Sequence, residues 1–274
     1  MKYHRNYSIA GLPFETATDL RSVAGFMDSY FAAYRSNEPP AFSIFFDKNA
    51  PLPVSLNRKL IVPEIEHDEH GNYLILNNSS ERAALGYIEN NGKQCHLNGG
   101  LRTDEYLLSA AIRSCIQFQL ERNNGFFLHA ACGSIAGRGV VFTGESTAGK
   151  TTALHNLHPD SIIAEDAVAL RMHDAKPYVH AIPFRGEHPA KTPLDVLCFP
   201  RKWHGEPRLT REEPGTVAVE LTANALFSAP SSPQLMSDVL ATVIRFGSSI
   251  PGYNCYFDLS TNLSTVFAKY GILN

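Results

Sequence analysis

The chain has 274 residues, of which 44% are hydrophobic and 19% charged, as in a globular protein of one large or two modest domains. Its 24 basic and 27 acidic residues give a net charge of −3, which argues against nucleic acid as a bulk partner. The chain shows no signal peptide, no apolar run near the ~18 residues of a membrane span, and five scattered cysteines without a C-x-x-C pair. We therefore expect a cytoplasmic protein with reduced thiols and no membrane partner.

The first hundred residues are predicted to be rich in β-structure. A strand is expected at Tyr7–Leu12 and a helix at Thr18–Tyr34, followed by strands at residues 42–46, 59–62, 73–76 and 83–88. Two histidines and two acids in His67–Asn72 are compatible with a metal site, but Gly71 and Asn72 favour a solvated hairpin turn. A helix over Thr103–Leu120 then leads into a second part, so we expect domains at residues 1–100 and 101–274.

Residues Gly144–Thr151 fit the pattern G-x-x-x-x-G-K-[ST], which is typical of loops that bind nucleotide phosphates. Gly144 and Gly149 permit backbone angles that a side chain would forbid, so the main chain can approach phosphate oxygens. Lys150 is expected to reach the β- and γ-phosphates, and the Thr151 hydroxyl to bind Mg²⁺. The expected phosphate-binding residues are Gly144, Glu145, Ser146, Thr147, Ala148, Gly149, Lys150, Thr151 and Thr152.

The sequence around this loop supports the motif. The apolar run Gly139–Thr143 predicts a buried strand before the loop, and Thr152–Leu157 predicts a helix after it, ended by Pro159. A preceding strand over Phe126–Ile135 forms a hairpin with the loop strand. Strand, glycine loop and helix thus follow in the order that a phosphate-binding loop requires.

Two acids follow the next predicted strand, Ser161–Ala164. Phosphoryl transfer needs oxygen ligands for Mg²⁺ and a base for the accepting hydroxyl, and Glu165 and Asp166 suit both tasks. The carboxyl ends of neighbouring strands lie above one crevice, so we expect these carboxylates to face the phosphates. The alternative is a solvated pair of acids at a strand end.

Four other side chains are candidates for the site or for an ordinary structural role. A histidine in an apolar strand, such as His129, is often a packed core residue, but its strand is one hairpin away from the loop strand. Arg185 suits the charge of a transferred phosphoryl group, or a surface salt bridge. His155 and His158 resemble a metal pair only weakly.

The rest of the chain predicts further mixed structure. A hairpin is expected over residues 167–182, strands at 196–199 and 253–258, and helices at 217–227 and 234–246. The expected fold class is therefore α/β, mixed and β-rich.

From Leu128 to about Ile182 the sequence resembles the kinase domain of the bacterial HPr kinase/phosphorylase family, and still more its short relatives encoded beside lasso-peptide genes. The matching segments are the strand with His129, the glycine loop, and the strand that ends in Glu165 and Asp166. Residues Pro183–Glu187 look like the Phe-Arg-Gly-Glu segment of those short relatives. The resemblance implies a core like that of phosphoenolpyruvate carboxykinase, with His129 and the acid pair in the catalytic site.

The chain departs from the family at two places. The family's first acid is usually Asp, where this chain has Glu165. Pro183 stands two positions before Arg185, so the Glu-x-Arg-Gly core of the full signature is absent, and Glu187 is the candidate to take the place of the missing acid. The resemblance therefore does not imply that HPr itself is the substrate.

Together these residues predict an ATP- and Mg²⁺-dependent kinase that phosphorylates a hydroxyl, most simply a serine, of a peptide, protein or small molecule. Thr151 and Asp166 would bind the metal and Glu165 would accept the proton, while the resemblance adds His129 as a support and Arg185 with Glu187 as the far wall. A nucleotide-dependent switch without a phosphoacceptor is the alternative. A carboxykinase shares the fold, but its substrate signature is not recognisable. The sequence leaves the oligomeric state open, a homo-oligomer included.

Overall fold

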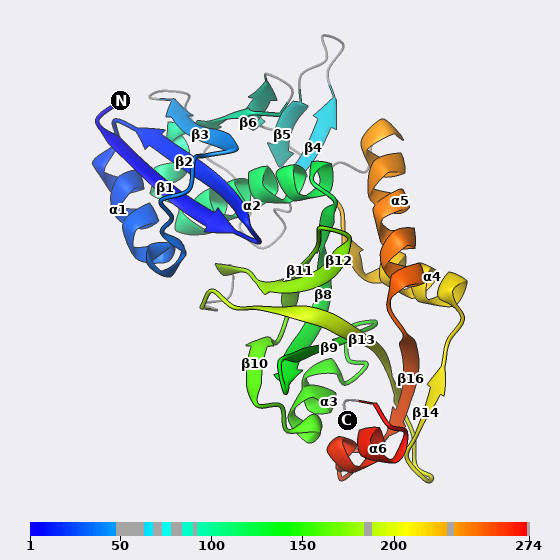
Figure 1. Ribbon diagram of the computed structural model, residues 1–274. Coiled ribbons are helices and arrows are strands. Elements are labelled where there is room, and N and C mark those ends of the chain that lie inside the picture. The colour runs from blue at the N-terminus through cyan, green and yellow to red at the C-terminus, as the bar shows by residue number, and fades with distance from the viewer. Residues whose placement is uncertain are drawn as a thin grey trace. The chain divides into compact units, whose positions relative to one another are not determined.

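The computed structural model describes residues 1–47, 63–67, 73–77, 84–89, 92–183, 188–228 and 233–272. The chain divides into two compact units, Met1–Asn123 with Phe227–Ser237, and Asn124–Leu226 with Asp238–Asn274. Each unit contains one large β-sheet with helices (Figure 1). The fold is therefore of the mixed, β-rich α/β class that the sequence predicts.

Unit 1 is built on a seven-stranded sheet with the order β1-β2-β3-β7-β6-β5-β4. Its strands are β1 (Tyr3–Ile9), β2 (Leu12–Thr18), β3 (Phe42–Asp47), β4 (Pro63–His67), β5 (Tyr73–Asn77), β6 (Ala84–Glu89) and β7 (Gln94–Asn98). The single strand predicted over Tyr7–Leu12 is wrong, because the chain turns there. Ala10 and Gly11 have φ angles of 53° and 70°, so β1 and β2 form a hairpin with Ile9 opposite Leu12.

The helices of unit 1 are α1 (Arg21–Tyr30), α2 (Glu105–Arg122) and the short 3₁₀ helices η1 (Ala32–Tyr34) and η2 (Gly99–Thr103). Asp104 begins α2, because its carboxylate accepts hydrogen bonds from the main-chain N–H groups of Tyr106 and Leu107. Most of α2 is buried, and the helix belongs to unit 1. Unit 1 therefore extends to Asn123, past the boundary expected near residue 100.

Two predictions for the N-terminal part fall partly on residues outside the described ranges. The strand predicted at residues 59–62 and residues 68–72 of the expected turn are among them. The flanking strands β4 and β5 do pair antiparallel, with His67 opposite Tyr73, which is the pairing of a hairpin.

Unit 2 contains a nine-stranded sheet whose main path is β10-β8-β11-β12-β13-β16-β14. Its strands are β8 (Gly125–Ile135), β9 (Arg138–Thr143), β10 (Ser161–Ala164), β11 (Ala167–His173), β12 (Lys176–Ala181), β13 (Lys191–Lys202), β14 (Arg208–Arg211), β15 (Ala225–Leu226) and β16 (Gly252–Phe257). Its helices are α3 (Lys150–Leu157), α4 (Pro214–Asn224) and α6 (Leu263–Lys269), while α5 (Pro233–Ser249) contributes residues to both units.

The arrangement around β9 positions the site. β9 pairs antiparallel with β8 and parallel with β13, and β13 pairs parallel with β16. Lys202, the last residue of β13, lies opposite Phe257, the last residue of β16. The carboxyl ends of β9, β13 and β16 therefore point to the same edge of the sheet, the edge at which α/β proteins bind ligands.

Helix α3 covers one face of this sheet with the face that the sequence predicts. Ala153, Leu154 and Leu157 are buried in a cluster with Phe142 from β9 and Phe267 from α6. Burying such side chains stabilises the fold by roughly 1.5–3 kcal/mol for each large residue. The loop between β9 and α3 is thus held at both ends by packed elements.

All five cysteines are buried and free. Cys95 and Cys115 lie in unit 1, and Cys132, Cys198 and Cys255 lie in unit 2. Among the helices in the described ranges, none combines the length and the apolar character needed to span a membrane.

Candidate active site

The predicted phosphate-binding loop connects β9 to α3. Its backbone takes left-handed angles at Thr147 and Gly149, with φ of 67° and 96°, and Gly144 has a φ of 153°. Glycine is the residue that adopts such angles without steric cost, which explains both glycines of the motif. The helix begins at Lys150 rather than at the predicted Thr152, so Thr151 lies in its first turn.

Lys150 is fixed inside this loop. Its Nζ donates hydrogen bonds to the carbonyl oxygens of Gly144 and Glu145, each at 2.9 Å. The residue is only 7% exposed, and burial lowers the pKa of its ammonium group, while the charge of Asp166 opposes that shift. A cation is therefore held where an anion bound to the loop amides and to the start of α3 would meet it.

The acid pair follows β10 and is tied to the first turns of α3. The Thr151 hydroxyl donates to the main-chain oxygen of Glu165 at 3.3 Å. The Glu165 carboxylate contacts His155, with Oε1 at 2.7 Å from Nε2, and both side chains are about half exposed. The structure thus brings Glu165 beside the loop helix. His155 contacts this acid and does not form a metal pair with His158.

His129 lies beside Asp166. Its Nδ1 is 2.8 Å from the main-chain oxygen of Asp166 and 3.8 Å from the carboxylate oxygen Oδ1. A carbonyl oxygen can only accept, so Nδ1 carries the hydrogen and the neutral ring keeps a lone pair on Nε2. The Thr143 hydroxyl, at the end of β9, donates to the His129 carbonyl at 3.0 Å. His129 is therefore a partly exposed side chain at the site and not a core residue.

The predicted site residues have different outcomes. The structure brings together His129, Lys150, Thr151, Glu165 and Asp166. Arg185 and Glu187 lie outside the described residues. In the described ranges, no group of three or more His, Cys, Asp or Glu side chains is placed to hold a metal ion.

The residues nevertheless fit Mg²⁺ of the kind that nucleotides bring. This ion prefers oxygen ligands and commonly binds through one or two carboxylates, with phosphate oxygens and water completing its shell. The Thr151 hydroxyl and the Asp166 carboxylate are oxygen groups of this kind at the site.

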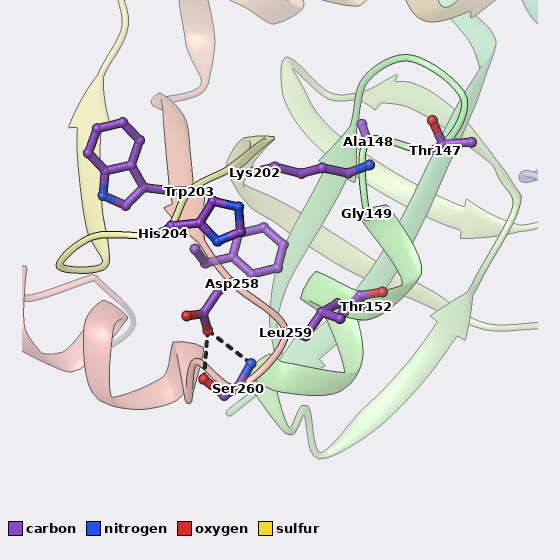
Figure 2. Close-up of a pocket in the computed structure, with 11 residues that line it drawn as sticks. Thr147, Ala148, Gly149, Thr152, Lys202, Trp203, His204, Asp258, Leu259 and Ser260 are labelled. Carbon is purple, nitrogen blue, oxygen red and sulfur yellow. Dashed lines mark hydrogen bonds between the residues drawn. The ribbon is translucent and has the colours of Figure 1, made fainter.

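A pocket of about 650 Å³ adjoins the loop on the side of β13 and β16. It is lined by Thr147, Ala148, Gly149, Thr152, Lys202, Trp203, His204, Phe257, Asp258, Leu259 and Ser260 (Figure 2). The last seven of these residues were missed in the sequence. Their signal is that they lie at or just after the ends of two predicted strands, but nothing local shows that those strands run parallel to β9.

Comparison with known proteins gives structural likenesses alone. No protein-family model matches the chain, and no curated protein matches it. Among solved structures it is similar to the Hpr(Ser) kinase/phosphatase from Coxiella burnetii, at 12% identity and a TM-score of 0.30, over 53% of this chain and 95% of that chain. At this identity and TM-score the likeness does not identify the function of the chain.

Proposed function

We propose that the chain is an ATP- and Mg²⁺-dependent kinase that transfers the γ-phosphate to a hydroxyl group. The loop amides and Lys150 would bind the triphosphate. Thr151 and Asp166 would hold the metal, which neutralises phosphate charge when it is bound. Glu165 would accept the hydroxyl proton, and His129 would support the site.

The main support for this proposal is that the short helix α3 contacts both the phosphate-binding loop and the segment that carries the acid pair. At its first residue, Lys150 is held in the phosphate-binding loop. At its second residue, the Thr151 hydroxyl donates to the main-chain oxygen of Glu165, the first residue of the acid pair. A structural turn has no need of a buried ammonium group, whereas phosphoryl transfer needs a cation and carboxylates around one phosphate.

The reaction would proceed as an in-line displacement. The acceptor oxygen forms a bond to the γ-phosphorus while the bond to the β–γ bridging oxygen breaks, and ADP leaves. The acceptor proton passes to the Glu165 carboxylate. Lys150 meets the charge on the transferred group, in a position that the two loop carbonyls already fix.

The proposal extends to the group that accepts the phosphate. We infer a serine hydroxyl of a peptide, protein or small molecule, by the sequence resemblance to the short HPr-kinase-like proteins. Arg185 and Glu187 would complete the far wall of the acceptor site.

The test is incubation with Mg²⁺, cell extract and ATP labelled on the γ-phosphate. Transfer of label to an acceptor supports a kinase, and loss of that transfer in Lys150→Ala assigns it to this site. Release of labelled inorganic phosphate alone would instead indicate the nucleotide-dependent switch. The proposal is contradicted if the chain neither transfers the label nor releases labelled phosphate.

A further inference from the structure

The pocket beside the loop and the acid pair lie on different sides of β9. β9 is paired with β8, which carries His129, along one edge and with β13 along the other. The pocket is formed at the ends of β13 and β16, and none of His129, Glu165 and Asp166 lines it. A ligand that fills the pocket would therefore touch the phosphate loop without occupying the acid side.

The mouth of the pocket carries an unusually exposed apolar side chain. Leu259 is 82% exposed, more than any other large hydrophobic side chain among the described residues. Its turn is rigid, because the Asp258 carboxylate accepts hydrogen bonds from Ser260 and from the Thr261 hydroxyl at 2.8–2.9 Å. Asn156 of α3 also donates to the Leu259 carbonyl at 3.2 Å. An apolar residue held out in this way becomes buried only when something packs on it.

Trp203 forms another part of the pocket wall and is also held in place. Its main-chain N–H donates to the Phe257 carbonyl at 2.9 Å. The Arg208 guanidinium lies 4.4 Å from the ring centroids of both Trp203 and Tyr256, and these two rings meet edge to face with their centroids 5.8 Å apart. Trp203 as a residue remains 37% exposed and lines the pocket, so part of its surface is available to a ligand.

The phosphate end of the pocket is continuous with the loop. A Cβ built on Gly149 would lie 3.6 Å from Cζ of Phe257, so this ring packs directly against the loop. Figure 2 shows the Lys202 side chain extending toward Ala148 and Gly149, and all three residues line the same pocket. The pocket is thus apolar and aromatic at one end and cationic at the end that meets the phosphates.

We propose that this pocket binds the base and sugar of the nucleoside triphosphate whose phosphates the loop binds. The volume of about 650 Å³ is in the range of small-ligand sites, roughly 300–1,000 Å³. An aromatic base packs on aromatic and aliphatic side chains, here Trp203, Phe257 and Leu259. Lys202 meets the phosphates nearer the sugar.

This inference rests on the proposed function and adds a direction to it. With the nucleoside on the β13 side, the γ-phosphate extends past Lys150 toward Asp166. The acceptor hydroxyl then approaches from the β8 side, where Glu165 and the Nε2 atom of His129 lie. The nucleotide and the acceptor therefore use separate surfaces of unit 2.

The chain contains a single tryptophan, Trp203, beside 11 tyrosines, so fluorescence excited at wavelengths that only tryptophan absorbs reports on this pocket alone. The experiment titrates the full chain with ATP, with GTP and with inorganic tripolyphosphate, by fluorescence and by calorimetry, in the presence of Mg²⁺. We expect ATP or GTP to change the fluorescence at the calorimetric midpoint, and tripolyphosphate to release heat without that change. Leu259→Ser should lower the affinity for the tighter-binding nucleotide about 5- to 30-fold, because the apolar surface that the leucine buries against the ligand is lost.

The matched control is Val219→Ser, which removes a comparable exposed apolar side chain, 68% exposed, from α4 outside the pocket. Its nucleotide affinity should equal that of the wild type, and both variants should bind tripolyphosphate as the wild type does. A different result would overturn the pocket assignment and leave the phosphate loop standing. In that result tripolyphosphate binds, neither nucleotide alters the fluorescence, and Leu259→Ser lowers the affinity for neither nucleotide. If no ligand binds, both proposals are overturned.

Discussion

Nε2 of His155 lies 2.7 Å from Oε1 of Glu165, which joins helix α3 to the end of strand β10. The contact occupies one oxygen of the acid proposed as the base and leaves the other for the acceptor proton. Both side chains are about half exposed, so the pair contributes roughly 0–1 kcal/mol and serves to orient Glu165.

Glu165→Gln should therefore slow phosphoryl transfer about 10²- to 10⁴-fold while binding of Mg-ATP is retained. His155→Ala should cost no more than about fivefold, since it removes only a partly exposed partner. Single-turnover transfer to the labelled acceptor distinguishes the two. If Glu165→Gln transfers at the wild-type rate, the proton goes elsewhere, and the free Nε2 of His129 is the next candidate.

Lys150→Ala should reduce phosphoryl transfer on the order of 10²- to 10³-fold, because one preorganised donor to the transferred group is lost. The fold should remain, since the side chain bonds only to carbonyls of its own loop. Lys176→Ala is the control, because it removes the same charge from an exposed position at the start of β12. Steady-state kinetics and circular dichroism make the comparison, and equal activities of the two variants would remove Lys150 from the mechanism.

Asp166→Asn should lose the Mg²⁺ dependence of ATP binding, whereas Glu165→Gln should keep it. A metal ligand acts already in ground-state binding, but a general base acts only during transfer. Calorimetric titration of ATP with and without Mg²⁺ measures both. Equal losses in the two variants would mean that the acids do not divide the roles in this way.

Unit 1 contains a buried acid that predicts a pH dependence of stability. Burial raises the pKa of Glu121 to about 7 from its usual 4.5, although hydrogen bonds from Ser228 and Gln117 oppose the shift. Between these values the folded unit binds more protons than the unfolded chain, so its stability falls as the pH rises from about 4.5 to about 7, by on the order of 3 kcal/mol.

Glu121→Gln removes this titration and should flatten the pH dependence. Hydrogen exchange of the α2 amides at pH 5 and pH 7, corrected for intrinsic exchange rates, reports the opening of this unit. The wild type should lose protection between these pH values and the variant should not. A parallel loss in both proteins would assign the pH dependence to other groups.

The sequence predicts the parts of the site that depend on neighbours along the chain. The loop motif, the strand before it and the acids after β10 are local patterns, and apolar residues recur at helical spacing within Glu105–Arg122, a helix that is mostly buried. The contact between His155 and Glu165 could not be predicted, because it depends on how α3 lies against β10. Helix α6 was missed since it has only seven residues.

The pocket could not be predicted for a different reason. Trp203 and Leu259 are far apart in sequence, and both line the pocket because β13 and β16 run parallel to each other and to β9. Parallel pairing leaves no short-range signal like the turn of a hairpin. The turn at Ala10 was missed because the apolar run continues through it and hides the change of direction.

The buried thiols make each unit its own reporter of unfolding. Burial raises the pKa of Cys115, Cys132 and Cys198, and it raises that of Cys255 to about 12, so the reactive thiolate is scarce in the folded protein. A thiol reagent can modify them only when their surroundings open. Alkylation at Cys95 and Cys115 therefore records the opening of unit 1, and alkylation at the other three records that of unit 2. Mass spectrometry of the native chain can follow the two units separately, without any engineered label.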